Sequence, residues 1–295
     1  MWSTLVLLHG DAKSIPHFEI PDCISWHTCM RSVYLSDERL LAPLFFQSIA
    51  PGLQVYRGFD AYAFLLEIVC GLHSKLFGES EVQAQFKERF SENSLENSSL
   101  TEFLIKLRNQ ILEHSKIVRS NFLTGLGRQS YGGLCEKHIH NQRKVHLFGT
   151  GNLAESILPH LLNNNRETIV YGRNESRLKI LSERFKIQTK QWEEYVSDSH
   201  ASIIASSFFP EVMVSKFHQA SMILDFREND ISLLGMKNEK YIPFSKLLTS
   251  IENTNDSIAL IKPKVQLMIG HLTNAREEEQ IHIMNGWEDL PQVCY

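Results

Sequence analysis

One cysteine of this chain lies in a setting that could activate it as a nucleophile. Cys29 belongs to the segment His27-Thr28-Cys29-Met30-Arg31, at the end of a predicted strand that begins at Ile24. A neighbouring arginine lowers the pKa of a thiol and raises its thiolate fraction near neutral pH. Cysteine is also common as a small buried hydrophobic residue, so this segment alone leaves both roles open.

A second group of residues has the spacing of a dinucleotide-binding turn. Gly149-x-Gly151-x-x-Ala154 lies between a predicted strand at 145–148 and a predicted helix that runs to Leu162. The first glycine permits the tight turn, the second lets a pyrophosphate approach the backbone, and the small third residue lets helix and strand pack closely. A glycine-rich turn that binds nothing is the alternative. The candidate cofactor-binding residues here are Gly149, Thr150, Gly151, Asn152, Leu153 and Ala154.

The end of the next predicted strand, at 168–171, indicates which dinucleotide would bind. An NAD enzyme places a carboxylate there for the ribose 2′-hydroxyl, but this chain continues as Gly172-Arg173-Asn174-Glu175-Ser176-Arg177. Arginine offers charge-assisted hydrogen bonds to a 2′-phosphate. The sequence therefore favours NADPH over NADH, and only Glu175 argues against it. The further cofactor-binding candidates are Arg173, Asn174, Ser176 and Arg177.

A local basic segment is hidden within an acidic chain. The whole sequence has a net charge of -4, yet residues 101–144 carry eight lysines or arginines against three glutamates. Such a segment is either a solvated helix face or a surface for a phosphate backbone, and spacing alone does not separate the two.

Composition limits the remaining classes. A length of 295 residues suggests about two domains, and 43% hydrophobic with 22% charged residues is ordinary globular usage. Five cysteines without a CxxC pair support neither a zinc knuckle nor a disulfide framework, and the pair His138 and His140 lacks partners at ligand spacing. We expect no bound metal. No apolar stretch reaches the ~20 residues of a membrane span and the N-terminus lacks a basic lead, so we expect a cytoplasmic protein.

The predicted elements give an α/β chain. Strands are expected at 2–8 and 24–29, helices at 60–72, 79–90 and 100–118, and an exposed loop at 91–99. From residue 145, strand and helix alternate through strands at 202–205 and 222–225, which predicts a doubly wound parallel sheet. We expect an N-terminal α+β catalytic domain at 1–98, basic linking helices at 99–143, a nucleotide-binding domain at 144–250 and a short C-terminal helical segment at 251–295.

Several segments together resemble the glutamyl-tRNA reductase family. Thr28-Cys29-Met30-Arg31 is similar to the family's Thr-Cys-Asn-Arg, and Gly71-Leu72-His73-Ser74 to its Gly-Leu-Asp-Ser. The segment 78–87, GESEVQAQFK, resembles the signature that follows, and Lys116-Ile-Val-Arg119 resembles Lys-x-Val-Arg. The glycine turn and Gly172-Arg173-Asn174 complete a series whose order and spacing agree over roughly residues 4–250.

The resemblance implies a definite reaction and a Rossmann nucleotide-binding domain. The Cys29 thiolate would attack the ester that joins glutamate to tRNA, and NADPH would reduce the resulting thioester to glutamate-1-semialdehyde, the first step of tetrapyrrole (heme) biosynthesis. The partners are then glutamyl-tRNA and, as the resemblance allows, a glutamate-1-semialdehyde aminomutase. The substrate-binding candidates are Thr28, Arg31, Ser74, Glu79, Gln85, Lys116 and Arg119.

Departures from the family pattern keep other functions open. Met30, Val33 and His73 replace family residues near the substrate pocket, and His73 is either an acid or base or a structural helix-end histidine. One alternative is a degenerate homologue that binds NADPH or tRNA as a regulator; another is an unrelated small-molecule NADP dehydrogenase. Because only about 45 residues follow Ser250, most of the family's dimerisation domain is missing, and we expect a monomer or weak dimer.

Overall fold

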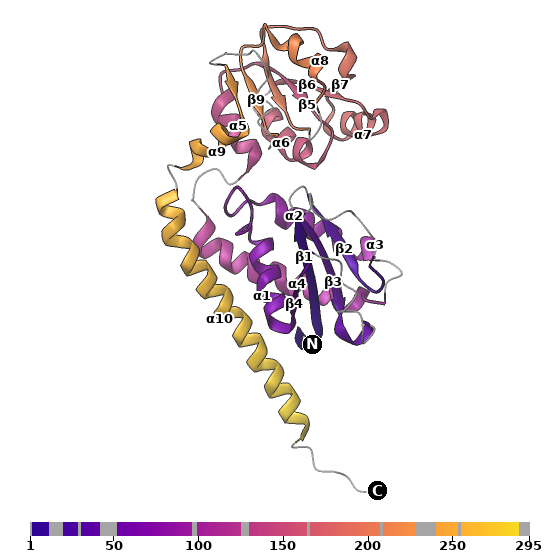
Figure 1. The fold of residues 1–295 in the computed structure, drawn as a ribbon, viewed down its shortest axis with the longest axis vertical. Helices are drawn as coiled ribbons and strands as arrows, with labels where there is room; N and C mark the ends of the chain where they lie inside the picture. Colours follow the sequence, from indigo (N-terminus) through magenta and orange to yellow (C-terminus); the bar gives the residue numbers. More distant parts are fainter. Residues whose placement is uncertain are drawn as a thin grey trace. The chain divides into compact units, whose positions relative to one another are not determined.

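The chain forms two structural units. The computed structural model describes residues 2–11, 20–28, 31–41, 52–95, 99–124, 130–163, 166–206, 209–227, 240–252 and 255–288. The first unit comprises residues 1–126 together with 257–295, and the second comprises residues 127–256. The second unit is thus inserted, in sequence, between two parts of the first (Figure 1).

An antiparallel sheet organises the first unit. Its strands are β1 (Leu5–Asp11), β2 (Ile24–His27), β3 (Arg31–Asp37) and β4 (Gln54–Arg57), in the order β2-β3-β1-β4. All seven residues of β3 are buried, because one face of the sheet packs on the main core of the unit and the other carries a small cluster of Val6, Leu8 and Tyr34. Strands β3 and β4 were not predicted from the sequence.

Helices cover one face of this sheet. They are α1 (Gly58–Val69), α2 (Glu81–Arg89), α3 (Glu92–Leu95) and α4 (Thr101–Val118), which a π-helical turn extends from Arg119 to Leu123. The helix expected from Asp60 begins two residues earlier, with Arg57 at its N-cap. The loop expected at 91–99 contains α3, because buried Leu95 fixes a short helix against the core.

The C-terminal helix belongs to the first unit. Helix α10 (Asn255–Glu288) has 34 residues, more than the short segment expected, and its Val265 and Ile269 lie in the main core of that unit. Gln280 accepts a hydrogen bond from the backbone N–H of Trp2 at 3.2 Å and donates one to the Ser3 hydroxyl at 2.8 Å. This helix is therefore an integral part of the N-terminal unit.

A parallel sheet of six strands organises the second unit. The strands are β5 (Lys144–Phe148), β6 (Glu167–Gly172), β7 (Gln188–Gln191), β8 (Ala201–Ile204), β9 (Ile223–Asp225) and β10 (Tyr241–Ile242), in the order β10-β9-β8-β5-β6-β7. Two apolar cores lie on its two faces. Every described pairing is parallel, and this order confirms the predicted doubly wound sheet.

Helices α5 (Tyr131–Ile139), α6 (Asn152–Leu162), α7 (Glu175–Phe185), α8 (Glu211–Val214) and α9 (Phe244–Glu252) complete the second unit. The segment 99–143, expected to link the domains, is divided: α4 lies in the first unit and α5 in the second. The boundaries between the two units in the sequence therefore lie near residues 126 and 256, whereas boundaries at 98, 143 and 250 were expected. None of the described helices combines the length and apolar character needed to cross a membrane.

Candidate functional site

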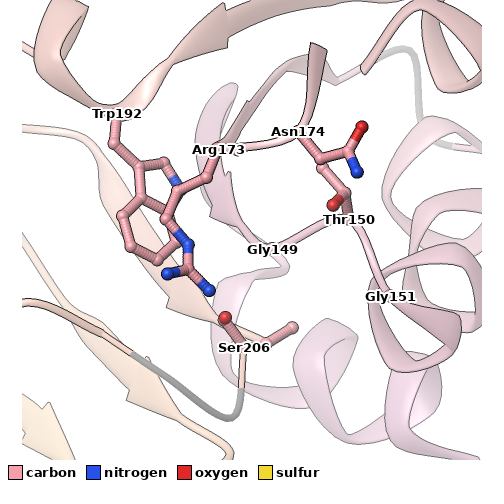
Figure 2. A pocket seen from close by; sticks show the side chains of 9 residues that line it. Gly149, Thr150, Gly151, Arg173, Asn174, Trp192 and Ser206 are labelled. Atoms are coloured by element: carbon pink, nitrogen blue, oxygen red, sulfur yellow. The ribbon is translucent and has the colours of Figure 1, made fainter. Parts of the chain in front are cut away.

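A pocket of about 490 Å³ lies where strands β5, β6, β7 and β8 end. It is lined by Gly149, Thr150, Gly151, Gly172, Arg173, Asn174, Trp192, Ala205 and Ser206 (Figure 2). Strand order reverses between β5 and β8, and ligands of doubly wound sheets bind at such a switch point, beyond the carboxyl ends of the strands. The pocket is therefore placed where this architecture binds nucleotides.

Gly149 has a backbone conformation that only glycine adopts readily. Its φ is +136°, its N–H donates to the carbonyl oxygen of Tyr171 at 2.9 Å, and a Cβ added here would lie 2.4 Å from the carbonyl oxygen of Ala205. A Cβ at Gly151, by contrast, would meet no atom within 4 Å. Gly149 closes the turn, whereas Gly151 leaves space at the pocket.

The first turn of α6 follows this glycine loop directly. Gly151 is the N-cap of α6, and within the described residues no side chain caps this helix. The backbone N–H groups in the first turn of a helix have no partner within the helix, and such a turn is a common binding site for phosphate groups. Ala154 is buried in the core between helix and sheet, as expected, while Asn152 and Leu153 do not line the pocket.

The loop after β6 is held by α7. The side chain of Asn174 accepts a hydrogen bond from the N–H of Arg177 at 3.0 Å and so caps α7. The Arg177 guanidinium forms an ion pair with Glu155 and donates to the carbonyl oxygen of Thr150 at 3.3 Å. Arg177 thus supports the glycine loop, and neither Arg177 nor Ser176 lines the pocket.

Arg173 and Glu175, which follow β6, differ in whether they line the pocket. The carboxylate of Glu175 accepts a hydrogen bond from Gln191 at 3.2 Å and does not line the pocket. The guanidinium carbon of Arg173 lies 5.2 Å from the ring centroid of Trp192. The pocket therefore presents an arginine, and not the neighbouring carboxylate, at the end of β6.

Four lining residues were not identified as site residues from the sequence. Ala205 and Ser206 directly follow β8, so the rule that ligands bind beyond strand ends could have found them. Gly172 precedes Arg173, and its added Cβ would lie 2.4 Å from the Thr150 side chain. Trp192 follows the polar strand β7, which the alternation of apolar residues does not reveal.

The candidate nucleophile Cys29 lies outside the described residues, but the residues on either side are defined. The Thr28 N–H donates to the carbonyl oxygen of Arg31 at 2.9 Å, and the Arg31 N–H donates to the Thr28 hydroxyl at 3.1 Å. Arg31 is only 4% exposed, and its guanidinium donates to the carbonyl oxygen of His73 at 2.5 Å. Thr28 and Arg31 are thus hydrogen-bonded to each other, and Arg31 is also hydrogen-bonded to the turn that follows α1.

His73 forms part of an aromatic and acidic cluster. Its Nε2 lies 2.6 Å from a carboxylate oxygen of Glu67, and its ring lies 5.0 Å from that of Phe64. The Phe64 ring in turn stacks on Tyr56 at 4.0 Å. These contacts give His73 a structural hydrogen bond, as one of the two interpretations expected. The adjacent Ser74 is half-buried.

Arg119, a substrate-binding candidate, forms hydrogen bonds to the backbone of the first unit. Its guanidinium donates to the carbonyl oxygens of Glu79 at 3.3 Å and Cys70 at 3.5 Å, and burial lowers its pKa. Arg119 therefore supports the backbone between α1 and α2, and the contact with substrate that the resemblance implies for it stays a prediction. Glu79 is buried in the same region, Gln85 is half-buried on α2 and Lys116 is exposed on α4.

Several charges of the basic segment 101–144 have partners nearby. Its residues are divided between the two units, and several of its charges are engaged locally. Lys106 pairs with Glu102 at 2.5 Å, Lys144 pairs with Glu167 at 2.8 Å, and Arg108 donates to the carbonyl oxygen of Lys87 at 3.2 Å. These contacts favour the solvated helix face over a dedicated phosphate-binding surface.

Three other cysteines lie in surroundings that disfavour the thiolate. Burial raises the pKa of Cys23 to about 11 and that of Cys70 to about 12, and it also raises the pKa of Cys135. All three are free thiols. Over the described part of the chain, no group of three or more histidine, cysteine or acidic side chains is arranged to hold a metal ion.

Comparison with known proteins finds a match in the N-terminal part of the chain. Residues 11–122 match the family model described as the N-terminal domain of glutamyl-tRNAGlu reductase. This part of the chain is similar to the N-terminal domain of the glutamyl-tRNA reductases. The resemblance seen in its sequence is thereby confirmed, and the matched range contains Cys29 and the first-unit residues Thr28, Arg31, Ser74, Glu79, Gln85, Lys116 and Arg119.

Two curated relatives and one solved structure show how much of the chain this similarity covers. The glutamyl-tRNA reductases of Solidesulfovibrio magneticus and Pelotomaculum thermopropionicum are 28% and 27% identical over 177 and 179 residues, or 56% and 57% of this chain. These regions span only 38% and 40% of the relatives' own lengths. Glutamyl-tRNA reductase from Methanopyrus kandleri has a TM-score of 0.55 at 19% identity, covering 95% of this chain and 81% of that chain, which shows a shared fold.

Proposed function

We propose that this protein is an NADPH-dependent reductase that acts on glutamyl-tRNA through a thioester on Cys29. The observation that carries the proposal is the match of residues 11–122 to the glutamyl-tRNA reductase N-terminal domain, in a chain that also has a switch-point pocket. A nucleophile and a nicotinamide site are both needed, because a thioester accepts a hydride more readily than an ester does.

The pocket fits a dinucleotide phosphate in two respects. Gly151 leaves open space beside the uncapped first turn of α6, where backbone N–H groups would donate to a pyrophosphate. Arg173 stands at the end of β6, where a carboxylate would otherwise select NADH, and it would bind the 2′-phosphate. Arg177 and Asn174 would hold the two loops in place through their contacts with Thr150 and α7.

The first chemical step belongs to the N-terminal unit. The Cys29 sulfur would attack the ester carbonyl carbon, the bond to the tRNA ribose oxygen would break, and that oxygen would take a proton. Thr28 and Arg31 would fix the strand ends on either side of the nucleophile through their mutual hydrogen bonds. When bound, NADPH would supply the hydride that releases glutamate-1-semialdehyde and restores the thiolate.

A mass measurement tests nucleophile, substrate and reaction class together. Protein incubated with glutamyl-tRNA without NADPH is expected to gain the mass of a glutamyl group, and Cys29→Ser is expected to show no hydroxylamine-labile thioester. Added NADPH should remove the adduct and produce the semialdehyde. If charged tRNA gives neither adduct nor semialdehyde, the proposal is wrong.

The degenerate regulator remains the second candidate because Met30, Val33 and His73 depart from the family pattern. It predicts cofactor or tRNA binding that is identical in the wild type and in Cys29→Ser. An unrelated dehydrogenase is less well supported, since the family match lies in residues 11–122 and not in the nucleotide-binding unit.

A further inference from the structure

Trp192 lines the pocket yet has no part in the chemistry proposed above. It is 3% exposed, whereas Arg173 beside it is exposed. The guanidinium carbon of Arg173 lies 5.2 Å from the indole centroid, within the range of a cation–π interaction. Figure 2 shows the guanidinium against the indole and directed away from Asn174.

The indole is held rigidly from behind. Trp192 belongs to the buried cluster on one face of the parallel sheet, and its ring lies 5.5 Å from that of Phe209. It begins a short helical turn in which the Tyr195 N–H donates to the Trp192 carbonyl oxygen at 3.1 Å. The Gln191 N–H donates to the Glu194 carboxylate at 2.6 Å and closes the same turn. Trp192 is therefore a fixed surface on which a flexible side chain can rest.

Two neighbouring arginines are held by a carboxylate. Arg177 and Arg184 both bind the carboxylate of Glu155, which offsets their charge and holds them at α6. The guanidinium of Arg173 lies against the Trp192 indole at the pocket. An aromatic face restricts the positions of a guanidinium and, unlike a carboxylate, adds no negative charge that would compete with a bound phosphate.

We infer that Trp192 is a positioning residue that holds Arg173 for the 2′-phosphate of NADPH, and so helps the pocket discriminate NADPH from NADH. The inference rests on the proposed function, because it assumes that the pocket binds this dinucleotide. Trp192 acts through Arg173 and does not itself bind the phosphate.

Calorimetric titration with two nucleotides isolates this effect from catalysis. Adenosine 2′,5′-bisphosphate and adenosine 5′-monophosphate differ only in the 2′-phosphate, so the ratio of their affinities measures phosphate recognition. We expect Trp192→Leu to reduce the preference of the wild type for the bisphosphate by about fivefold to tenfold. Trp192→Phe keeps a weaker ring face and should give a smaller loss.

Two comparisons make the result specific. Phe217→Leu alters the same buried cluster away from the pocket and should keep the wild-type preference. In an Arg173→Gln background, Trp192→Leu should no longer change the preference, because the group that it positions has been removed.

Failure of the inference and failure of the proposed function give different results. If the wild type prefers the bisphosphate and folded Trp192→Leu retains that full preference, only the role of Trp192 is overturned. Should the leucine variant not fold, the same result with folded Trp192→Phe leads to the same conclusion. An equal loss of affinity for both nucleotides also overturns it. If the wild type shows no preference, NADPH selection itself is wrong, and the inference is wrong with it.

Discussion

At the scale of single residues, the two glycines of the nucleotide loop have separate tasks. Gly149 combines a positive φ with a close approach to the Ala205 backbone, whereas a methyl group at Gly151 would enter open space at the pocket. The fold therefore requires one glycine, whereas the other leaves the space that the proposed cofactor would need, although both belong to the same sequence pattern.

Alanine at each glycine should separate these tasks. Gly149→Ala is expected to lower the free energy of unfolding by about 2–4 kcal/mol, because it combines backbone strain with a clash. Gly151→Ala should lower the free energy of unfolding by at most about 1 kcal/mol but weaken NADPH binding about tenfold, since the methyl would occupy the path of the pyrophosphate. Urea unfolding and calorimetric titration measure the two quantities. Equal effects of both variants on stability would contradict this division.

The cysteines allow a second prediction at this scale. Burial raises the pKa values of Cys23, Cys70 and Cys135, so their thiolate fractions near pH 7.5 are small. In a Cys294→Ser background, brief iodoacetamide treatment of the folded protein should modify Cys29 first, as peptide mass mapping would show. Modification of Cys70 or Cys135 before Cys29 would argue against an activated nucleophile, and labelling in urea provides the control.

Residue roles could be predicted from the sequence only where a backbone rule links residue type to position. The positions of Gly149, Gly151 and Arg173 follow from their spacing relative to β5 and β6. Trp192 could not be predicted, because its place depends on the packing of an edge strand. The backbone contacts of Arg119 could not be predicted either, because its carbonyl acceptors come from the distant residues Cys70 and Glu79.

At the scale of elements, one face of α10 packs in the core of the first unit, although other residues along the helix are exposed. Ile269 is 2% exposed within the main core of the first unit, whereas Leu267, on the same helix, is 64% exposed. The Arg276 guanidinium also donates to Nε2 of His114 on α4 at 3.5 Å. One face of α10 is therefore built into the first unit.

Truncation on each face of α10 provides a matched test. Ile269→Ala should lower the free energy of unfolding of the first unit by about 3 kcal/mol, through lost apolar burial and the cavity that remains. Leu267→Ala should stay within about 0.5 kcal/mol of the wild type, because its side chain is largely in solvent. Thermal denaturation followed by circular dichroism would measure both. Similar losses for the two variants would show that α10 does not pack as described.

Element prediction was accurate where local pattern and burial agree. The alternating strands and helices from β5 to α7 could be predicted from the sequence because β5 and β6 are short apolar runs between turn residues. Strand β7 has the sequence QTKQ at a sheet edge and gives no apolar signal. Strand β3 lies between β1 and β2, and its pairing depends on contacts across the sheet.

At the scale of the whole molecule, resistance to acid should depend on buried histidines. His146 on β5 is 2% exposed, its Nε2 lies 2.8 Å from an Asp198 oxygen, and burial lowers its pKa in spite of this carboxylate. Burial also lowers the pKa values of His9 and His114 in the first unit. The unfolded chain therefore binds more protons than the folded chain below about pH 6.5.

The free energy of unfolding should accordingly fall as the pH is lowered from 7.5 to 5.5. His146→Phe removes one of the responsible groups, so its stability should fall less steeply over this range than that of the wild type. His140→Gln, on the exposed end of α5, should retain the wild-type slope. Urea unfolding at several pH values measures these slopes. An unchanged slope in His146→Phe would contradict the prediction.

The contribution of α10 to the first unit also constrains how the chain folds during synthesis. The ribosome produces residues 1–126, then the whole nucleotide-binding unit, and only afterwards the helix that supplies Val265 and Ile269. The second unit is continuous in sequence and is complete before this helix emerges. The part of the molecule that is made first must therefore wait longest for its full core, and it depends on a segment translated more than a hundred residues later.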